Sequence, residues 1–358
     1  MADSVRDAQW PLRVFNAQNR VWPHSNGQGV LVAVIDSGIR SSHVDLFGKV
    51  ANGFDYMTND SEPKDHDKYG HGTGMASLIC GHGHGDKHSD GILGLSPGVQ
   101  ILPIAIDIGT TADSKEARAI RYAVDHDAKV INMSFAGPAS VEGDADAISY
   151  ARTHDVVLVA SAGNRGSDRL EWPAAYPGVV SVGAVDADGQ VWPQSNYGPQ
   201  LTLTAPGVNI VAAGAHSDTE YRLSDGTSDA AAYVSAEAAL VRAAFPRLTA
   251  GQVVNRMIKS AMNPTGKAHD DHYGYGIIRP DAALTFDIPA GPAAGPLPQA
   301  AVSATAAGVA PEGRQVAGVR PVGGGGGGGV VVGGVAVAVV GIVGAGVWWW
   351  RRRARGAR

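Results

Sequence analysis

Short runs of apolar residues recur along the chain, each bounded by glycine, proline or polar residues. The run at 30–35 (VLVAVI) is uninterrupted, as is typical of a strand that is buried on both faces of a parallel sheet. Similar runs predict further strands at 100–106, 129–133, 156–160 and 179–185. All five runs are short enough to be strands rather than helices.

Helical patterns lie between and beyond these runs, at 71–80, 114–127, 143–153 and 228–244. The alternation of strands and helices predicts an α/β fold with a mostly parallel central sheet that is covered on both faces. Another helix is expected after the capping box formed by Thr249 and Gln252. Its apolar face would hold Val253, Met257, Ile258 and Ala261.

Three polar residues stand beside glycines in separate segments. Asp36 follows the first strand in VIDSG, His71 begins HGTG, and Ser228 ends GTS. A serine hydroxyl becomes a good nucleophile when a histidine takes its proton, and a carboxylate fixes the tautomer of that histidine. The chain order Asp, His, Ser is one of the known orders of a hydrolytic triad. These three residues therefore predict nucleophilic catalysis.

The segments around these residues resemble those of the subtilisin-like serine proteases, the subtilases of peptidase family S8. The resemblance covers about residues 28–285 and is carried by VAVIDSGI, HGTGMAS, ASAGN and GTS. It implies a subtilisin-like three-layer fold and a serine endopeptidase that forms an acyl-enzyme. Asp36 would be the orienting acid, His71 the general base and Ser228 the nucleophile. Asn164 would donate its amide to the oxyanion, together with the backbone N–H of Ser228.

The same resemblance implies two walls of the main substrate pocket. One wall, which in the family also pairs with the substrate backbone, would be formed by Ser134, Phe135, Ala136 and Gly137. The other would be formed by Ser161, Ala162 and Gly163, directly after Ala160. The alternative is that these residues belong to ordinary loops. The small side chains leave room for a substrate side chain but do not identify it.

The residue after the proposed nucleophile departs from the family pattern. Subtilases usually carry a bulky apolar residue there, often Met, whereas this chain has Asp229. We interpret Asp229 first as an acid in the first turn of a helix, where it favours the helix dipole by roughly 0.3–1 kcal/mol. The alternative is a carboxylate on the leaving-group side of the site. There it would stabilise the imidazolium of His71 or disfavour acidic residues after the scissile bond.

Metal ligands and cofactors are not assigned from the sequence, and no organic cofactor is expected. The histidines of 81–90 (GHGHGDKHSD) are interpreted as part of a solvated loop, because no structural-zinc spacing accompanies them. Calcium is possible but unassigned, since no EF-hand spacing occurs. The candidate calcium ligands are Asn59, Asp60, Asp65 and Asp67. The histidines of the segment 81–90 are His82, His84 and His88.

Composition adds little evidence of partners in the catalytic part. The formal net charge of −5 gives no reason to expect nucleic acid, so the expected partner is a protein or peptide substrate. Cys80 is the only cysteine, so no intrachain disulfide can form. We divide the chain into an N-terminal extension (1–27), a peptidase domain (28–287) and a C-terminal region.

The C-terminal region predicts a membrane anchor. Residues 288–329 are rich in Pro, Ala and Gly, which is typical of a flexible linker. Residues 330–350 form a stretch of 21 uncharged residues that ends in three tryptophans. This is expected for a transmembrane helix with an aromatic belt at the membrane interface. The alternatives are a disordered apolar tail or a buried helix. The tail 351–358 holds five arginines, which places it in the cytoplasm and the protease domain on the outer face.

The N-terminus does not supply the export signal that this orientation requires. Residues 1–11 have neither a basic region nor an apolar core, so they do not form a signal peptide. We expect that the true start lies upstream; the alternative is insertion by the tail, with the protease inside the cell. A subtilase domain with a linker and one C-terminal span also resembles the mycosins, membrane-anchored subtilases of actinobacterial type VII secretion. A second hypothesis is therefore a catalytically silent peptide-binding or scaffold component of a secretion complex.

Overall fold

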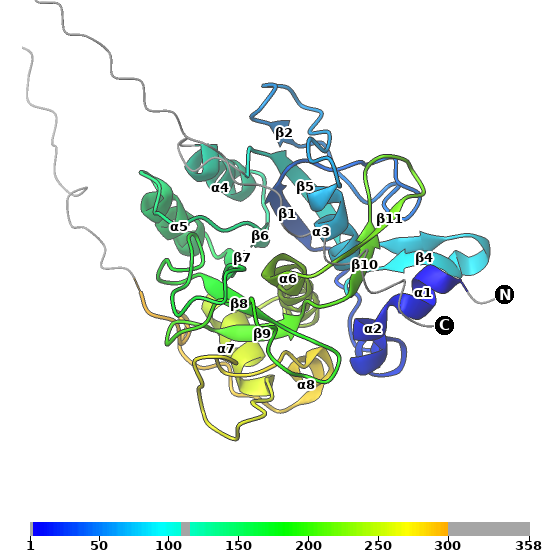
Figure 1. The fold of residues 1–358 in the computed structure, drawn as a ribbon. Helices are drawn as coiled ribbons and strands as arrows, with labels where there is room; N and C mark the ends of the chain where they lie inside the picture. Colours follow the sequence, from blue (N-terminus) through cyan, green and yellow to red (C-terminus); the bar gives the residue numbers. More distant parts are fainter. Residues whose placement is uncertain (1–2, 109–114, 300–358) are drawn as a thin grey trace, which may run out of the picture. The chain divides into compact units, whose positions relative to one another are not determined.

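A seven-stranded parallel sheet runs through the centre of the protein in the computed structural model, which describes residues 3–108 and 115–299 (Figure 1). Every pairing within this sheet is parallel. The strands are, in spatial order, β2 (Phe54–Asp55), β5 (Gln100–Ala105), β1 (Leu31–Asp36), β6 (Val130–Met133), β7 (Val157–Ser161), β8 (Val180–Val185) and β9 (Leu203–Pro206).

Helices cover both faces of this sheet. On one face, α3 (His71–Cys80) and α6 (Thr227–Ala244) pack against each other, with α7 (Ala250–Ser260) and α8 (Pro280–Thr285) beyond them. The opposite face is covered by α4 (Lys115–Asp125) and α5 (Asp144–Thr153), which lie side by side in Figure 1. Alternate residues of β1 enter the two apolar cores, Val32 and Val34 on one face and Ala33 and Ile35 on the other. The predicted α/β layering is thus confirmed.

Two antiparallel hairpins lie outside the main sheet. One pairs β10 (Ile210–Ala213) with β11 (Tyr221–Ser224). The other pairs β3 (His82–His84) with β4 (Asp90–Leu93), joined by a 3-10 turn, η2 (Asp86–His88). The prediction of a solvated loop at 81–90 was therefore wrong in part. The hairpin is held to the domain because His84 Nδ1 lies 2.7 Å from the buried Asp45 Oδ1.

The N-terminal segment packs on the same core, although the sequence placed it in a separate extension. It forms α1 (Ser4–Ala8), α2 (Trp10–Val14) and the π-helix η1 (Ala17–Val21). Phe15 and Val21 are buried in the core that contains α6. In addition, Gln9 donates to the Leu93 carbonyl and accepts from the Leu93 N–H, at 2.8 and 3.0 Å. Burial of these apolar side chains ties the segment to the peptidase fold.

The beginning of the expected linker also lies on the domain. Residues 288–299 run beside α7, whose Asn255 amide donates to the carbonyls of Pro289 and Ala290 at 3.1 and 3.2 Å. The Thr249 hydroxyl donates to the Ala293 carbonyl at 2.6 Å. The remaining linker residues 300–329, the expected span 330–350 and the basic tail 351–358 lie outside the described residues. Within 3–108 and 115–299, no helix combines the length and apolar character that a membrane crossing requires.

Candidate active site

Asp36 and His71 meet where β1 ends and α3 begins. His71 Nδ1 lies 2.7 Å from Asp36 Oδ1, and the carboxylate also accepts the backbone N–H of Ser37 at 2.8 Å. Asp36 is fully buried, whereas the side chain of His71 is 24% exposed. The next residue, Gly72, permits this approach, because a Cβ there would lie 2.2 Å from the Gly38 carbonyl oxygen. Glycine at 72 therefore lets the helix begin against the end of the strand.

The contact with Asp36 determines which protonation state of the His71 imidazole is favoured. Burial by itself would lower the pKa of His71, but the charge and the hydrogen bond of Asp36 outweigh it, so the pKa is raised above the ordinary histidine value. A raised pKa favours the imidazolium that forms when a general base accepts a proton. The pair therefore has the electrostatic character of a base and its orienting acid.

Ser228 lies in the first turn of α6, the helix that is buried against the sheet. Its hydroxyl donates to the backbone carbonyl of Ser134 at 2.7 Å, while the Ser134 hydroxyl donates to the backbone carbonyl of Ser228 at 2.9 Å. Among the described residues, no hydrogen bond joins Ser228 to His71, so the structure brings together two of the three predicted triad members by direct bonding. The helices α3 and α6 pack together, and Asp229, the residue after Ser228, is close enough to His71 to act on its charge.

Asn164 is anchored through one end of its side-chain amide. Its Oδ1 accepts the backbone N–H and the hydroxyl of Thr227 at 2.9 and 2.8 Å. Because the oxygen is held this way, the amide nitrogen is left as a donor, and Nδ2 would lie 3.8 Å from a Cβ built on Gly226. Asn164 is exposed. An N–H donor is thus fixed beside the start of α6, where an oxyanion donor is expected.

The two expected substrate walls are joined to each other and to neighbouring segments. The Ser161 hydroxyl donates to the Phe135 carbonyl at 3.0 Å, which connects the walls. Gly137 pairs with Trp172 through both of its backbone groups, at 2.8 and 2.9 Å. These bonds leave the backbone of Ala136 without a partner among the described residues. Of the first wall, Ala136 is hence the residue most open to pairing with a substrate strand.

The second wall is deeply buried. Ser161 is 1% exposed and Ala162 is 0% exposed, and Gly163 donates its N–H to the Thr227 hydroxyl at 3.3 Å. A small cavity of about 40 Å³ is lined by Phe135, Ala136 and Gly137, and also by Trp172. Three residues of the first wall thus line this cavity, whereas none of the second wall does.

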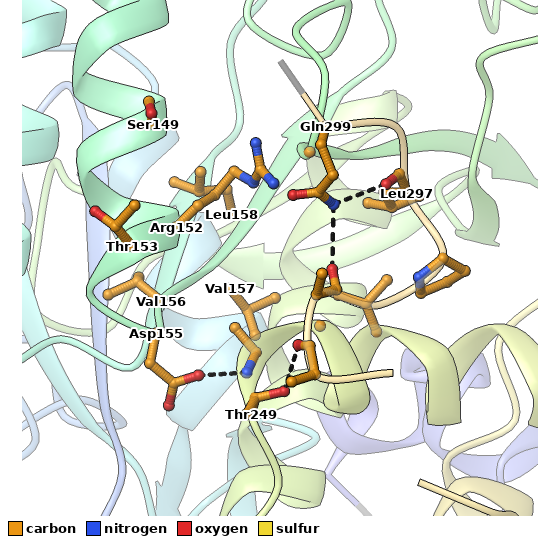
Figure 2. A pocket seen from close by; sticks show the side chains of 17 residues that line it. Ser149, Arg152, Thr153, Asp155, Val156, Val157, Leu158, Thr249, Leu297 and Gln299 are labelled. Carbon is orange, nitrogen blue, oxygen red and sulfur yellow. Dashed lines mark hydrogen bonds between the residues drawn. The ribbon is translucent and has the colours of Figure 1, made fainter. Parts of the chain in front are cut away.

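A larger cavity of about 430 Å³ lies elsewhere, between the end of α5, the start of α7 and residues 293–299 (Figure 2). Arg152 and Asp155 line it from the α5 side, and Thr249 lines it from α7. Gln299 closes its edge by donating to the carbonyls of Ala294 and Leu297 at 3.1 and 2.8 Å. None of the proposed triad or oxyanion residues lines this cavity, so size alone would have misplaced the active site.

Two of the acidic residues considered for calcium, Asp65 and Asp67, bond to the segments that carry Asp36 and His71. Asp65 accepts the Ser37 hydroxyl at 2.8 Å and the backbone N–H of Thr73 at 2.9 Å, so it links the end of β1 to the first turn of α3. Asp67 accepts the backbone N–H of His71 at 3.2 Å. Within the described residues, no group of three or more His, Cys, Asp and Glu side chains has a metal-binding arrangement. Asn59 and Asp60 lie in the turn that follows β2.

Sequence reasoning missed these supporting roles, because hydrogen bonds between distant segments leave no local pattern. It also missed Arg222 on β11, whose Nη2 lies 3.8 Å from Asp229 Oδ1. Asp229 is 2% exposed and accepts the Ser224 hydroxyl at 3.0 Å. The first-turn placement of Asp229 is thus confirmed, and its charge also acts on His71.

The fold and this set of residues define a class: an α/β protein with a parallel sheet and a histidine–aspartate pair beside a serine at a helix start. Comparison with known proteins agrees. The sequence profile described as the subtilase family matches residues 27–276. Subtilisin DY from Bacillus licheniformis is 34% identical over 72% of this chain and 91% of its own length. The chain therefore belongs to the subtilase family of serine proteases.

Two other relatives show how far the similarity extends. Fervidolysin from Fervidobacterium pennivorans is 32% identical over 80% of this chain, and its crystal structure, titled as that of a keratinolytic enzyme related to subtilisin, superposes with a TM-score of 0.71. The chain spans 45% of fervidolysin. MycP1 from Mycobacterium smegmatis is 29% identical over 80% of this chain and 87% of its own, with a TM-score of 0.69.

Proposed function

We propose that the protein is a serine endopeptidase that hydrolyses peptide bonds through an acyl-enzyme. The observation that carries this proposal is the 2.7 Å hydrogen bond between His71 at the start of α3 and the buried Asp36; α3 packs on α6, whose first turn holds Ser228. Membership of the subtilase family supports the same reaction. Asp36, His71 and Ser228 would act as orienting acid, general base and nucleophile.

In the proposed reaction, His71 accepts the hydroxyl proton as Ser228 Oγ attacks the carbonyl carbon of the substrate. Asn164 Nδ2 and the backbone N–H of Ser228 stabilise the oxyanion of the tetrahedral intermediate. The imidazolium then returns the proton to the leaving amine as the C–N bond breaks. Water, deprotonated by His71, then attacks the acyl carbon; the ester bond to Ser228 Oγ breaks, His71 returns the proton to Oγ, and the acyl product leaves as a carboxylic acid.

The Ser228 hydroxyl must turn for this chemistry, since it donates to Ser134 in the resting arrangement. A serine side chain moves between staggered rotamers at little cost, and catalytic hydrogen bonds often form only when substrate binds. Substrate would lie along Ala136 on one side, with its side chain between the walls formed by Ser134–Gly137 and Ser161–Gly163. No organic cofactor takes part in this proposal.

We further propose that the chain acts on the outer face of a cell membrane, anchored by residues 330–350. The support is the uncharged apolar sequence with its tryptophan and arginine border. The similarity to MycP1, and to a MycP3 protease titled as belonging to the type VII (ESX-3) secretion system, supports partners in a secretion complex. Detection of residues 351–358 only after membrane permeabilisation, with the peptidase domain accessible in intact cells, would test this orientation.

A catalytically silent, peptide-binding role is the second candidate. The observation that favours it is the engagement of the Ser228 hydroxyl by Ser134.

Hydrolysis separates the two candidates. We expect the purified chain to cleave internal bonds of fluorogenic peptides in H₂¹⁸O, with one ¹⁸O in each new carboxyl group. Ser228→Ala should abolish cleavage, whereas Ser217→Ala, at an exposed turn, should not. A folded wild-type protein that binds peptides without cleaving them would support the silent role.

A further inference from the structure

An arginine and an aspartate form a buried ion pair beside the proposed triad. Asp229 follows Ser228 on α6 and is 2% exposed. Arg222 lies on β11, and its Nη2 is 3.8 Å from Asp229 Oδ1. The Arg222 side chain is 16% exposed, and its Nε and Nη2 are buried without a hydrogen-bond partner among the described residues. Burial raises the pKa of Asp229, and the charge of Arg222 opposes that rise, so the two groups interact where water screens charge poorly.

The guanidinium of Arg222 lies over α3, next to His71. A Cβ built on Gly74 would lie 2.3 Å from Nη2 and 2.6 Å from Nε, so the guanidinium fills the space of the missing side chain. Gly74 is the third residue after His71, and residues three apart lie on one face of a helix. The pair therefore borders the face of α3 on which the proposed base stands.

The two charges act on His71 in opposite directions. Arg222 acts to lower the pKa of the imidazole, and Asp229 acts to raise it. Two other charged groups that bond to His71 in the described part of the chain are anionic: Asp36 at the end of β1 bonds to Nδ1, and Asp67 in the preceding loop bonds to the backbone N–H. Asp225 acts on Asp229 from the end of the β11 segment. Arg222 is hence the cation that opposes protonation of His71.

We propose that Asp229 is a positioning residue that compensates Arg222, so that His71 can accept the Ser228 proton without facing an unpaired guanidinium. This inference rests on the proposed function. Arginine remains protonated throughout the accessible pH range, so the compensation must come from a carboxylate. A buried cation that has lost its partner is strongly unfavourable and also opposes formation of a second cation nearby. The apolar residue that subtilases usually carry at 229 would provide no such compensation.

The pairing with Arg222 also explains why residue 229 is an aspartate and not the apolar residue that is usual in subtilases. The Ser224 hydroxyl donates to both oxygens of Asp229, at 3.0 and 3.1 Å, and fixes the carboxylate toward β11, the strand that carries Arg222. An isolated first-turn acid would need neither this bond nor a buried cation opposite. Arg222 and Asp229 therefore act together, and substitution of one should be offset by substitution of the other.

The test compares Asp229→Asn, Arg222→Met and the double variant in the full chain. The pKa of His71 is measured by NMR titration of the imidazole and by the acid limb of kcat/KM. We expect Asp229→Asn to lower this pKa by about one unit and kcat by up to about tenfold, because the guanidinium is left uncompensated. Arg222→Met alone should leave the pKa at or above the wild-type value, and the double variant should restore it.

A surface cation provides the matched control. Lys267 pairs with Asp270 at 3.2 Å on an exposed loop, and Lys267→Met should leave the pKa of His71 unchanged. An unchanged pKa in Asp229→Asn, or a double variant that stays shifted, would overturn the proposal. If Asp229→Asn does not fold, recovery of folding in the double variant supports compensation, and failure of both variants to fold overturns it. Because NMR titration requires no catalysis, an inactive wild type would contradict the proposed function alone.

Discussion

Asn164 is the residue whose role depends most on how its side chain is held. Thr227 binds the amide oxygen twice, which leaves the amide nitrogen as the donor toward the start of α6. The motif ASAGN predicted a donor at this position through family resemblance. It could not predict the Thr227 anchor, since that contact joins residues 63 positions apart.

We expect Asn164→Ala to lower kcat about 10²–10³-fold with little change in KM, because the donor acts on an oxyanion that exists only during the reaction. Steady-state kinetics with a fluorogenic peptide measures both constants. Asn19→Ala, at an exposed position of the π-helix η1, provides a control for substitution of an asparagine. A loss confined to KM would contradict the oxyanion role.

Glu237 is a buried acid in the middle of α6 that no sequence motif predicted. Burial raises the pKa of Glu237 from 4.5 to about 8. The folded state therefore holds a proton that the unfolded chain releases above pH 4.5. Its contribution to stability is complete below that pH and is lost as the pH rises toward 8, on the order of 1.4 kcal/mol for each pH unit at most.

Glu237→Gln should remove this dependence, since glutamine does not titrate. We expect the variant to be more stable than the wild type at pH 8, with a smaller difference at pH 5, in urea denaturation monitored by circular dichroism. Glu62→Gln, on the surface near Lys64, should give equal stability changes at both pH values. An equal gain for Glu237→Gln at pH 5 and pH 8 would contradict a buried, protonated carboxyl.

At the scale of elements, local patterns predicted the interior of the fold well. The expected helix at 71–80 coincides with α3, and the five expected strands correspond to β1, β5, β6, β7 and β8. Each of these strands has a short apolar run of its own, and α3 begins in a glycine-rich segment. The hairpins β3–β4 and β10–β11 were not predicted, because their stability comes from cross-strand pairing and from contacts with distant residues.

The capping box before α7 was predicted from sequence and is present. Thr249 accepts the Gln252 N–H at 3.2 Å, and Gln252 accepts the Thr249 N–H at 3.1 Å. The Thr249 hydroxyl also holds the Ala293 carbonyl, which couples the helix start to the segment at 288–299. The expected face of the helix is buried at Val253, Met257 and Ile258, whereas Ala261 lies at the C-cap and is only partly buried.

Thr249→Ala should lower the free energy of unfolding by about 1 kcal/mol, because the first turn of α7 loses a side-chain acceptor. Urea denaturation measures the change. Proteolysis by an added protease at 288–299 should also become faster, as the Ala293 contact is lost. Thr265→Ala, in an exposed turn where Thr265 bonds only to nearby Asn263 and Lys267, provides the comparison and should change neither quantity appreciably. Equal effects of both substitutions would argue against the cap.

For the molecule as a whole, the motifs located the peptidase fold, but the predicted boundaries at both of its ends were too narrow. The N-terminal segment lacks a long apolar run, yet Phe15 packs edge-on against Tyr233 of α6, with 6.0 Å between ring centroids. Likewise, residues 288–299 have the composition of a linker but bond to α7 through backbone carbonyls, which every residue type provides. The N-terminal segment and residues 288–299 are both held by contacts with the surface that they cover. Their own sequences therefore give little indication that they belong to the folded domain.

The arrangement of the proposed triad follows from the same whole-molecule topology. Asp36 is the last residue of β1 and therefore lies at the carboxyl end of the sheet, where functional residues are commonly found in parallel α/β folds. The helices that begin with His71 and contain Ser228 both pack on one face of that sheet. Sequence order and family motifs predicted these residues, whereas the hydrogen bond of Ser228 to Ser134 could be found only in three dimensions.

Labelling of the full chain by a fluorophosphonate tests the central claim most directly, because this reagent reacts with an activated serine. The account predicts one phosphonylated residue, Ser228, identified by mass spectrometry of the digested protein. Labelling should disappear in Ser228→Ala and become much slower in His71→Ala, with both variants folded by circular dichroism. A folded wild-type protein that is never labelled, or is labelled at another serine, would contradict it.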